Sequence, residues 1–276
     1  MSIERLKQVW VHPFGDKAAI QKQLWDNAAK KFNEHGIPDP KTNEFLKLVF
    51  EKARPDSSMS ALDIGCGCGL YSLALAPHIK QAVGIDISSE MIKYAQKNAQ
   101  KHTDKTSFRC LDWAQLDIDK AGYKKAFDIV FAHMTPAVAD FATFDKMNEC
   151  SKGWCFAAKP ARKQSRLQER IFAAAGITFG DKTKDKTGAT GDGIPYIFEY
   201  LWCKGYNPEF YYRSDTWHAE KSLKDTTEWM ILWAKLHTDI SARQEQAIAA
   251  ALEKEAVNDI VADSTDTTIV TVCWHV

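Results

Sequence analysis

The residues best suited to bind a ligand are three glycines at alternate positions. Gly65, Gly67 and Gly69 follow the apolar segment 60–64 and precede an apolar pattern typical of a helix. Glycine lets the backbone turn sharply, and its missing Cβ lets a ligand touch main-chain atoms. Asp63 lies just before the first glycine. The spacing predicts a strand, a tight bend and a helix that together bind a polar small molecule.

Two further carboxylates follow the next two predicted strands. Asp86 ends the segment 82–86, and Asp112 follows the segment 106–110. A carboxylate at the end of a strand can accept two hydrogen bonds from a ribose diol, and its charge strengthens both. We expect both carboxylates beside the glycines, because parallel strands end at one edge of a sheet. Each could instead be an ordinary helix-capping or turn aspartate.

The glycine spacing distinguishes between two kinds of nucleotide site. A dinucleotide fingerprint, G-x-G-x-x-G, would need glycine at position 70, where this sequence has Leu70. The observed G-x-G-x-G after Asp63 resembles the first motif of the class I S-adenosylmethionine-dependent methyltransferases. The segment 127–133, Phe-Asp-Ile-Val-Phe-Ala-His, resembles the fourth motif of that family. The resemblance covers roughly residues 59–160 and, more loosely, the whole length.

The resemblance implies how the cofactor, S-adenosylmethionine, would be bound. Asp86 would bind its ribose, and Asp112 would accept a hydrogen bond from its adenine amino group. Trp113 would offer a backbone N–H or an aromatic face, and Trp25 would cover the cofactor or pack as a buried aromatic residue. The full set of expected cofactor residues is Trp25, Asp63, Gly65, Gly67, Gly69, Asp86, Ile87, Asp112, Trp113 and Ala132. S-Adenosylhomocysteine would be the product formed from the cofactor.

The methyl end has one candidate base. His133 follows the fourth predicted strand, and imidazole titrates near neutrality, so His133 could take a proton from the acceptor or only shape the pocket. The Asn/Asp-Pro-Pro-aromatic motif of methyltransferases acting on DNA or glutamine amino groups is absent from 133–137, which favours a small-molecule acceptor. The sequence does not identify the acceptor atom.

An aromatic segment at 194–202 gives the candidate acceptor site. Tyr196, Glu199 and Tyr200 could form a pocket or orient a cation over aromatic faces. A helix that packs its aromatic face on the core is an equally good interpretation.

The elements that must position these residues alternate along the chain. Apolar runs predict strands at 60–64, 82–86, 106–110, 127–132, 153–158, 210–217 and 267–276, and helical patterns lie at 17–33, 42–52, 88–101, 162–175 and 223–236. Alternating strands and helices predict right-handed βαβ units and a mostly parallel sheet. The resemblance implies an α/β fold with a doubly wound seven-stranded sheet in the order 3-2-1-4-5-7-6 and an N-terminal helical cap.

We expect one domain over residues 1–276. It comprises a helical cap at 1–57, a cofactor-binding core at 58–160, and substrate-side elements with antiparallel strands six and seven at 161–276. The polar stretch 181–193 predicts an exposed loop. Ser241 followed by Gln244 is a capping-box pattern that begins another helix.

Composition limits the partners. Lys and Arg together number 36, equal to Asp and Glu, so the chain lacks the broad basic charge of a nucleic-acid-binding protein. No run suits a membrane helix or a signal peptide, and the seven cysteines form no CxxC pair, which predicts a reduced, cytoplasmic protein without a membrane partner. No spacing predicts a metal site. A methyltransferase acting on RNA or protein, an NAD(P)-dependent oxidoreductase and a noncatalytic cofactor-binding protein remain the alternatives, and the oligomeric state is not indicated.

Overall fold

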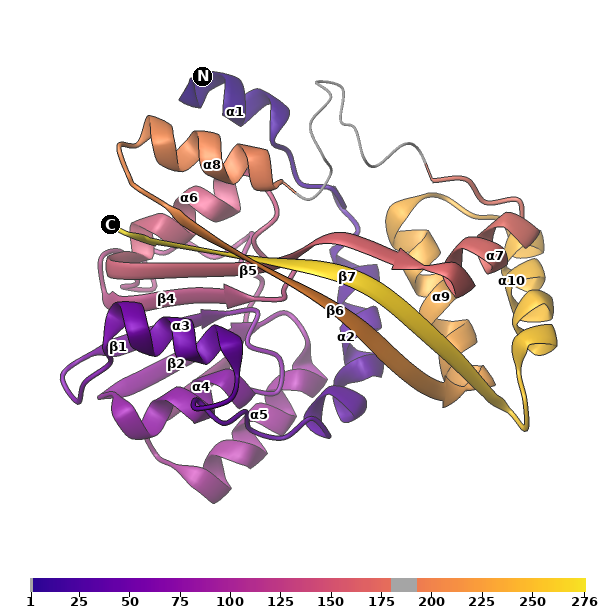
Figure 1. Cartoon of the computed structure of the whole chain (residues 1–276), viewed down its shortest axis with the longest axis horizontal. Coiled ribbons are helices and arrows are strands. Elements are labelled where there is room, and N and C mark those ends of the chain that lie inside the picture. Colours follow the sequence, from indigo (N-terminus) through magenta and orange to yellow (C-terminus); the bar gives the residue numbers. More distant parts are fainter. Residues whose placement is uncertain (1, 180–192) are drawn as a thin grey trace.

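A computed structural model describes residues 2–179 and 193–276 (Figure 1). Seven strands form one sheet in the order β3-β2-β1-β4-β5-β7-β6. The strands are β1 (Ser60–Ile64), β2 (Gln81–Asp86), β3 (Thr106–Cys110), β4 (Phe127–His133), β5 (Ser151–Ser165), β6 (Glu209–Ser222) and β7 (Ile260–His275). β1 to β5 pair in parallel, whereas β7 is antiparallel to both β5 and β6. The predicted strand number, order and mixed direction are confirmed.

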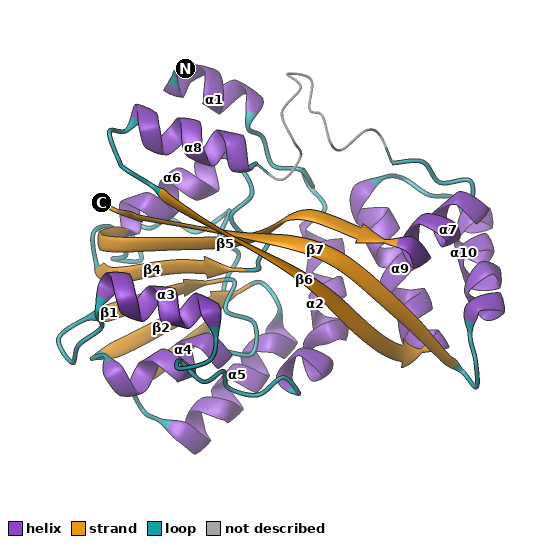
Figure 2. Cartoon of the chain, viewed as in Figure 1, coloured by secondary structure: helices purple, strands orange, loops and turns teal. Residues whose placement is uncertain are grey.

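Helices cover both faces of the sheet (Figure 2). They are α1 (Ile3–Val9), α2 (Ala18–Asn33), α3 (Glu44–Ala53), α4 (Leu70–Leu75), α5 (Ser89–His102), α6 (Phe141–Cys150), α7 (Arg166–Ala174), α8 (Ile194–Cys203), α9 (Leu223–His237) and α10 (Ala242–Glu255), with a 3₁₀ turn at Ala76–His78. Ile129 and Phe131 of β4 pack with α3 and α4, whereas Val130 and Ala132 pack with α6 and α8. Successive strand side chains point to opposite faces, so β4 is buried on both and the sheet is doubly wound.

The last three strands are much longer than predicted. β5, β7 and β6 continue past the parallel strands and carry α7, α9 and α10, which have a separate apolar cluster (Figure 1). We call this extension the ribbon (residues 160–165, 211–222 and 260–271). The helix predicted from residue 162 begins only at Arg166, because Arg162 pairs with Thr268 and Ser165 with Thr265 in the sheet. Strand pairing overrides the helix propensity of this charged segment.

The N-terminal helices α1 and α2 pack against different parts of the fold. α1, which the sequence analysis did not predict, buries Leu6 in the cluster that also holds α8. α2 packs between α5 and α9, and the Asp26 carboxylate of α2 accepts hydrogen bonds from Ser88 Oγ (2.6 Å) and the Glu90 amide (3.2 Å) at the start of α5. α2 is thus attached to the strand edge where β2 ends.

Two smaller predictions have different outcomes. The capping box is confirmed, because the Gln244 amide donates to Ser241 Oγ and the Gln244 side chain accepts from the Ser241 amide. The predicted loop at 181–193 lies, except for Gly193, outside the described residues. The expected single domain and its internal boundaries stay a prediction. Among the described residues, no helix has the length and apolar character needed to cross a membrane.

Candidate functional site

A cavity of about 2210 Å³ lies at the carboxyl ends of the parallel strands. Its walls come from the bend after β1, the ends of β2 and β4, helices α2 and α3, the ribbon and α9. Ligand sites in doubly wound sheets occur at this edge. A pocket for one drug-sized molecule occupies about 300–1,000 Å³, so this cavity has room for two small ligands.

The bend after β1 requires glycine at its first position. Gly65 has φ +70°, and its amide and that of Cys66 donate to the Ile85 carbonyl at 2.8 and 2.9 Å. A Cβ on Gly65 would lie 2.0 Å from Thr135 Oγ1, so the bend and the segment after β4 are in direct contact. Gly65 and Gly67 line the cavity, as the sequence predicted.

Gly69 has a different role from the one predicted. It does not line the cavity, and a Cβ there would lie 2.5 Å from Phe108 Cζ. With φ +75°, Gly69 begins α4 in a conformation that other residues rarely adopt. Its absent side chain therefore permits close packing of α4 on β3.

Asp86 joins the bend to the end of β2. Its Oδ2 accepts from the Gly67 amide (2.9 Å) and its Oδ1 from the Ser88 amide (2.8 Å). Burial raises the pKa of Asp86 above its usual value. A carboxylate oxygen can accept two hydrogen bonds, so each oxygen keeps capacity for a hydroxyl in the cavity. Asp86 and Ile87 both line the cavity, in the predicted place.

Asp63 lies beneath the bend instead of facing the cavity. Its side chain is buried and accepts a 2.7 Å hydrogen bond from Ser72 Oγ. Burial raises the pKa of Asp63 to about 7. Ala132 is buried too, because its position on β4 points toward α6 and α8. The predicted direct contact of Asp63 and Ala132 with a ligand is therefore wrong.

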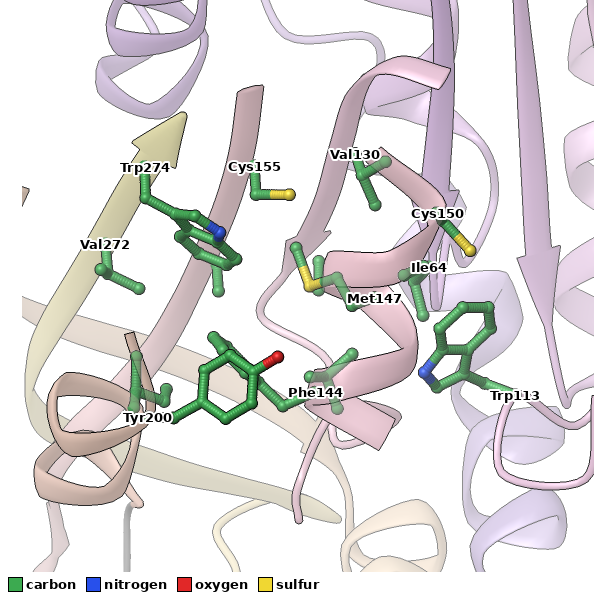
Figure 3. Close-up of a cluster of buried hydrophobic side chains, with 14 of the residues drawn as sticks. Ile64, Trp113, Val130, Phe144, Met147, Cys150, Cys155, Tyr200, Val272 and Trp274 are labelled. Carbon is green, nitrogen blue, oxygen red and sulfur yellow. The ribbon is translucent and has the colours of Figure 1, made fainter. Parts of the chain in front are cut away.

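The side chains of the adjacent residues Asp112 and Trp113 have different surroundings. Asp112 lines the cavity, and its Oδ1 accepts from the Ala114 amide at 2.9 Å. The indole of Trp113 is only 3% exposed and donates to the Thr143 carbonyl at 3.1 Å, within the core that Figure 3 shows. The predicted aromatic contact from Trp113 is thus excluded, and its backbone remains at the cavity wall.

His133 lies at the end of β4 against two tilted aromatic rings. Its imidazole is 4.1 Å from the Tyr71 ring and 4.5 Å from the Phe45 ring, measured between centroids. Burial, helped by the positive charge of Arg213, lowers the pKa of His133 to about 3. The imidazole is therefore neutral at pH 7 and a weak base, which removes the reason for assigning it general-base catalysis.

The three residues predicted to bind the acceptor lie away from the cavity. Tyr200 is fully buried among the core side chains of Figure 3. Its hydroxyl donates a hydrogen bond to Asp145 of α6. Tyr196 packs on Trp10, and Glu199 forms a 2.7 Å ion pair with Arg5 near α1. The prediction is wrong because α8 packs its aromatic face into the core on the opposite side of the sheet from α3.

The ribbon supplies cavity residues that the sequence analysis missed. Lys163, Arg213, Trp217 and Lys221 line the cavity from β5 and β6, and Trp229 does so from α9. Arg213, Trp217 and Lys221 are spaced four residues apart on one strand, so their side chains point to the same face, and this regular spacing was the available signal. Trp25 of α2 lines the cavity as expected, 6.1 Å from the Trp229 ring in an edge-on contact.

Metal ligands do not gather at this site. Among residues 2–179 and 193–276, no group of three or more His, Cys, Asp or Glu side chains could hold an ion. Cys66 and Cys68 follow the bend as free thiols, and burial raises both of their pKa values.

Comparison with known proteins finds methyltransferases. Residues 55–169 match the model of a methyltransferase domain family. A ubiquinone biosynthesis O-methyltransferase of Coxiella burnetii is 30% identical over 108 residues, which make up 39% of this chain and 43% of that enzyme. A release factor glutamine methyltransferase of Enterococcus faecalis is 39% identical over 71 residues, 25% of either chain. The chain thus spans less than half the length of these curated relatives.

Solved structures with a related shape are more distant in sequence. The geranyl diphosphate C-methyltransferase of Streptomyces coelicolor, crystallised with S-adenosyl-L-homocysteine, has a TM-score of 0.46 and 10% identity. The match covers 83% of this chain and 77% of that one.

Proposed function

We propose that the chain is a class I S-adenosylmethionine-dependent methyltransferase, an enzyme that transfers the cofactor's methyl group to a small-molecule acceptor; the methyltransferase-domain match over residues 55–169 and the strand order support this. S-Adenosylhomocysteine is the other product. One observation carries the proposal: the glycine bend and Asp86 form one wall of a cavity that has room for a second ligand.

The residues at this wall fit an adenosyl group. Asp86 has unused acceptor capacity for two ribose hydroxyls, and Asp112 Oδ2 makes no hydrogen bond with the described residues. Gly65 and Gly67 leave no Cβ between the ligand and the main chain. Trp25 on α2 supplies an aromatic surface at the same cavity. These groups would bind the ribose, the adenine amino group and the adenine ring.

When bound, the cofactor supplies a methyl group on a positively charged sulfur, so the protein needs only to align an acceptor lone pair with it. His133 would serve as a positioning group, because a neutral imidazole donates a hydrogen bond from one ring nitrogen and accepts one at the other without taking up a second proton. The best acceptors are atoms that present a lone pair at neutral pH. Enclosure between α2, α9 and the ribbon favours a small molecule over a macromolecule.

Calorimetric titration with S-adenosylhomocysteine tests the proposal. Asp86→Asn should weaken binding about 30-fold, because two charge-assisted hydrogen bonds become neutral ones of roughly half the strength. Asp104→Asn is the matched control, since Asp104 is an exposed aspartate outside the cavity. Circular dichroism verifies that both variants fold. Absence of binding to the wild type, stronger binding of NADH, or equal affinities in the two variants would contradict the proposal.

A further inference from the structure

The end of the cavity opposite the glycine bend contains lysines without acidic partners. Lys163 of β5 and Lys221 of β6 both line it. With the described residues, neither ammonium group forms an ion pair or a hydrogen bond. Instead, Lys163 Nζ lies 5.8 Å from the Trp217 ring centroid and Lys221 Nζ lies 4.8 Å from that of Trp229. Two cations thus face the cavity over aromatic rings.

Other positive groups lie near this pair. Lys31 of α2 lines the cavity and donates to the Glu220 carbonyl at 2.7 Å. Burial lowers the pKa of Lys163 and of Lys221, and repulsion by Lys31 and Lys163 lowers that of Lys221 further. Arg213 extends the positive charge toward His133. Positive charge therefore runs from the rings around His133 along the ribbon.

The neighbouring carboxylates do not neutralise the two ammonium groups. Asp263 raises the pKa of both lysines, but it accepts hydrogen bonds from Ser165 Oγ (2.8 Å) and Thr265 Oγ1 (3.4 Å). Asp225 also acts on Lys221 from a distance. The acidic side chains of Glu220 and Glu228 line the cavity without pairing with either lysine. Both ammonium groups therefore keep N–H donors that an anionic ligand can use for charge-assisted hydrogen bonds.

On the basis of the proposed function, we propose that the methyl acceptor is a small organic anion whose carboxylate or phosphate binds Lys163 and Lys221. Its apolar part packs against Trp217 and Trp229 at the ribbon end of the cavity. An anion between the two ammonium groups gains charge-assisted hydrogen bonds from both, and the indoles bury its carbon skeleton. The atom to be methylated then extends toward His133 and the glycine bend.

Binding of model anions tests the inference. Benzoate, phenyl phosphate and benzamide are titrated calorimetrically into the protein saturated with S-adenosylhomocysteine. We expect benzoate or phenyl phosphate to bind, and the stronger of the two identifies the preferred anionic group. Benzamide, which has the same ring without the charge, should bind at least about tenfold more weakly. Raising the salt concentration should weaken the binding of benzoate and phenyl phosphate but leave the binding of benzamide unchanged.

The double variant Lys163→Gln/Lys221→Gln should lose at least about tenfold in affinity for the anion while binding S-adenosylhomocysteine as the wild type does. Lys80→Gln/Lys224→Gln removes the same charge from exposed lysines outside the cavity and should change neither affinity. Equal binding of benzamide, anion binding unchanged in the first variant, or no binding of either anion would overturn the inference. None of these results affects the proposed function, which the separate titrations with S-adenosylhomocysteine and NADH test.

Discussion

The two ends of the cavity are built from different parts of the chain. The glycine end uses main-chain groups and carboxylates from one continuous stretch, residues 63–137, at the tips of adjacent parallel strands. The ribbon end uses the side chain of Lys163 on β5 together with those of Trp217, Lys221 and Trp229, which lie much later in the sequence on β6 and α9. A site made of backbone is specified by local sequence, whereas a site made of side chains depends on strand pairing.

The two ends also differ in charge. Asp86 and Asp112 face the glycine end, where the proposed cofactor carries hydroxyls, amino groups and a positive sulfur. Lys163, Lys221 and Arg213 face the ribbon end. This separation orients two ligands of opposite chemistry toward each other, and the predictions below test the parts that produce it.

The largest effect is expected from Gly65→Ala. The added Cβ would meet Thr135 Oγ1 at 2.0 Å, and the backbone has φ +70°. Strain and overpacking together should lower the free energy of unfolding by roughly 3–4 kcal/mol and abolish S-adenosylhomocysteine binding. Urea denaturation and calorimetry measure the two effects.

Gly36→Ala provides the control for this prediction. Gly36 has a similar φ, +72°, but no atom lies within 4 Å of the added Cβ. Gly36→Ala should therefore lower the free energy of unfolding only by the strain of the positive φ, about 1 kcal/mol. If both variants lost the same stability, contact between the bend and the segment after β4 would not be what requires glycine at position 65.

A smaller effect concerns the pH dependence of stability. The folded-state pKa of Asp63, about 7, lies above its ordinary value of 3.8, so between these values the folded protein holds a proton that the unfolded chain has released. Stability should therefore fall as the pH rises toward 7. Asp63→Asn imitates the protonated form. Between pH 5 and 8 its free energy of unfolding should therefore fall by roughly 2–3 kcal/mol less than that of the wild type.

Urea denaturation of both proteins at pH 5 and pH 8 measures this difference. Asp86, whose pKa burial also raises, is present in both proteins, and because its charge helps to raise the pKa of Asp63, the measured difference includes the interaction between the two carboxyl groups. His133 has a lowered pKa and acts in the opposite direction below about pH 6.5, again in both proteins. Parallel pH dependences of wild type and variant would show that Asp63 is ionised in the folded state without cost.

The sequence predicted those features that local patterns determine. The parallel sheet followed from alternating elements, and its strand order from the family resemblance. Gly65, Gly67, Asp86 and Asp112 took their predicted places because each lies at a strand end. The sequence did not reveal which side chains of the sheet contact the helices that cover it. The orientation of Ala132 depends on which face of β4 meets α6, a tertiary property.

The acceptor end was mispredicted for the same reason. The aromatic residues of α8 suited either a pocket or a core, and only packing against α6 and β7 shows that Tyr200 belongs to the core. The pKa of His133 depends on burial between Phe45 and Tyr71, from α3 and α4. Lys163 and Lys221 share a cavity only because β7 pairs with both of their strands.

A crystal structure of the protein with S-adenosylhomocysteine tests the central claim most directly. The claim is that the glycine end alone receives the cofactor and leaves the ribbon end for the acceptor. We predict ribose hydroxyls within hydrogen-bonding distance of the Asp86 carboxylate, the sulfur on the His133 side, and no contact between the ligand and Lys163 or Lys221. A ligand bound against the ribbon lysines, with Asp86 untouched, would contradict the account.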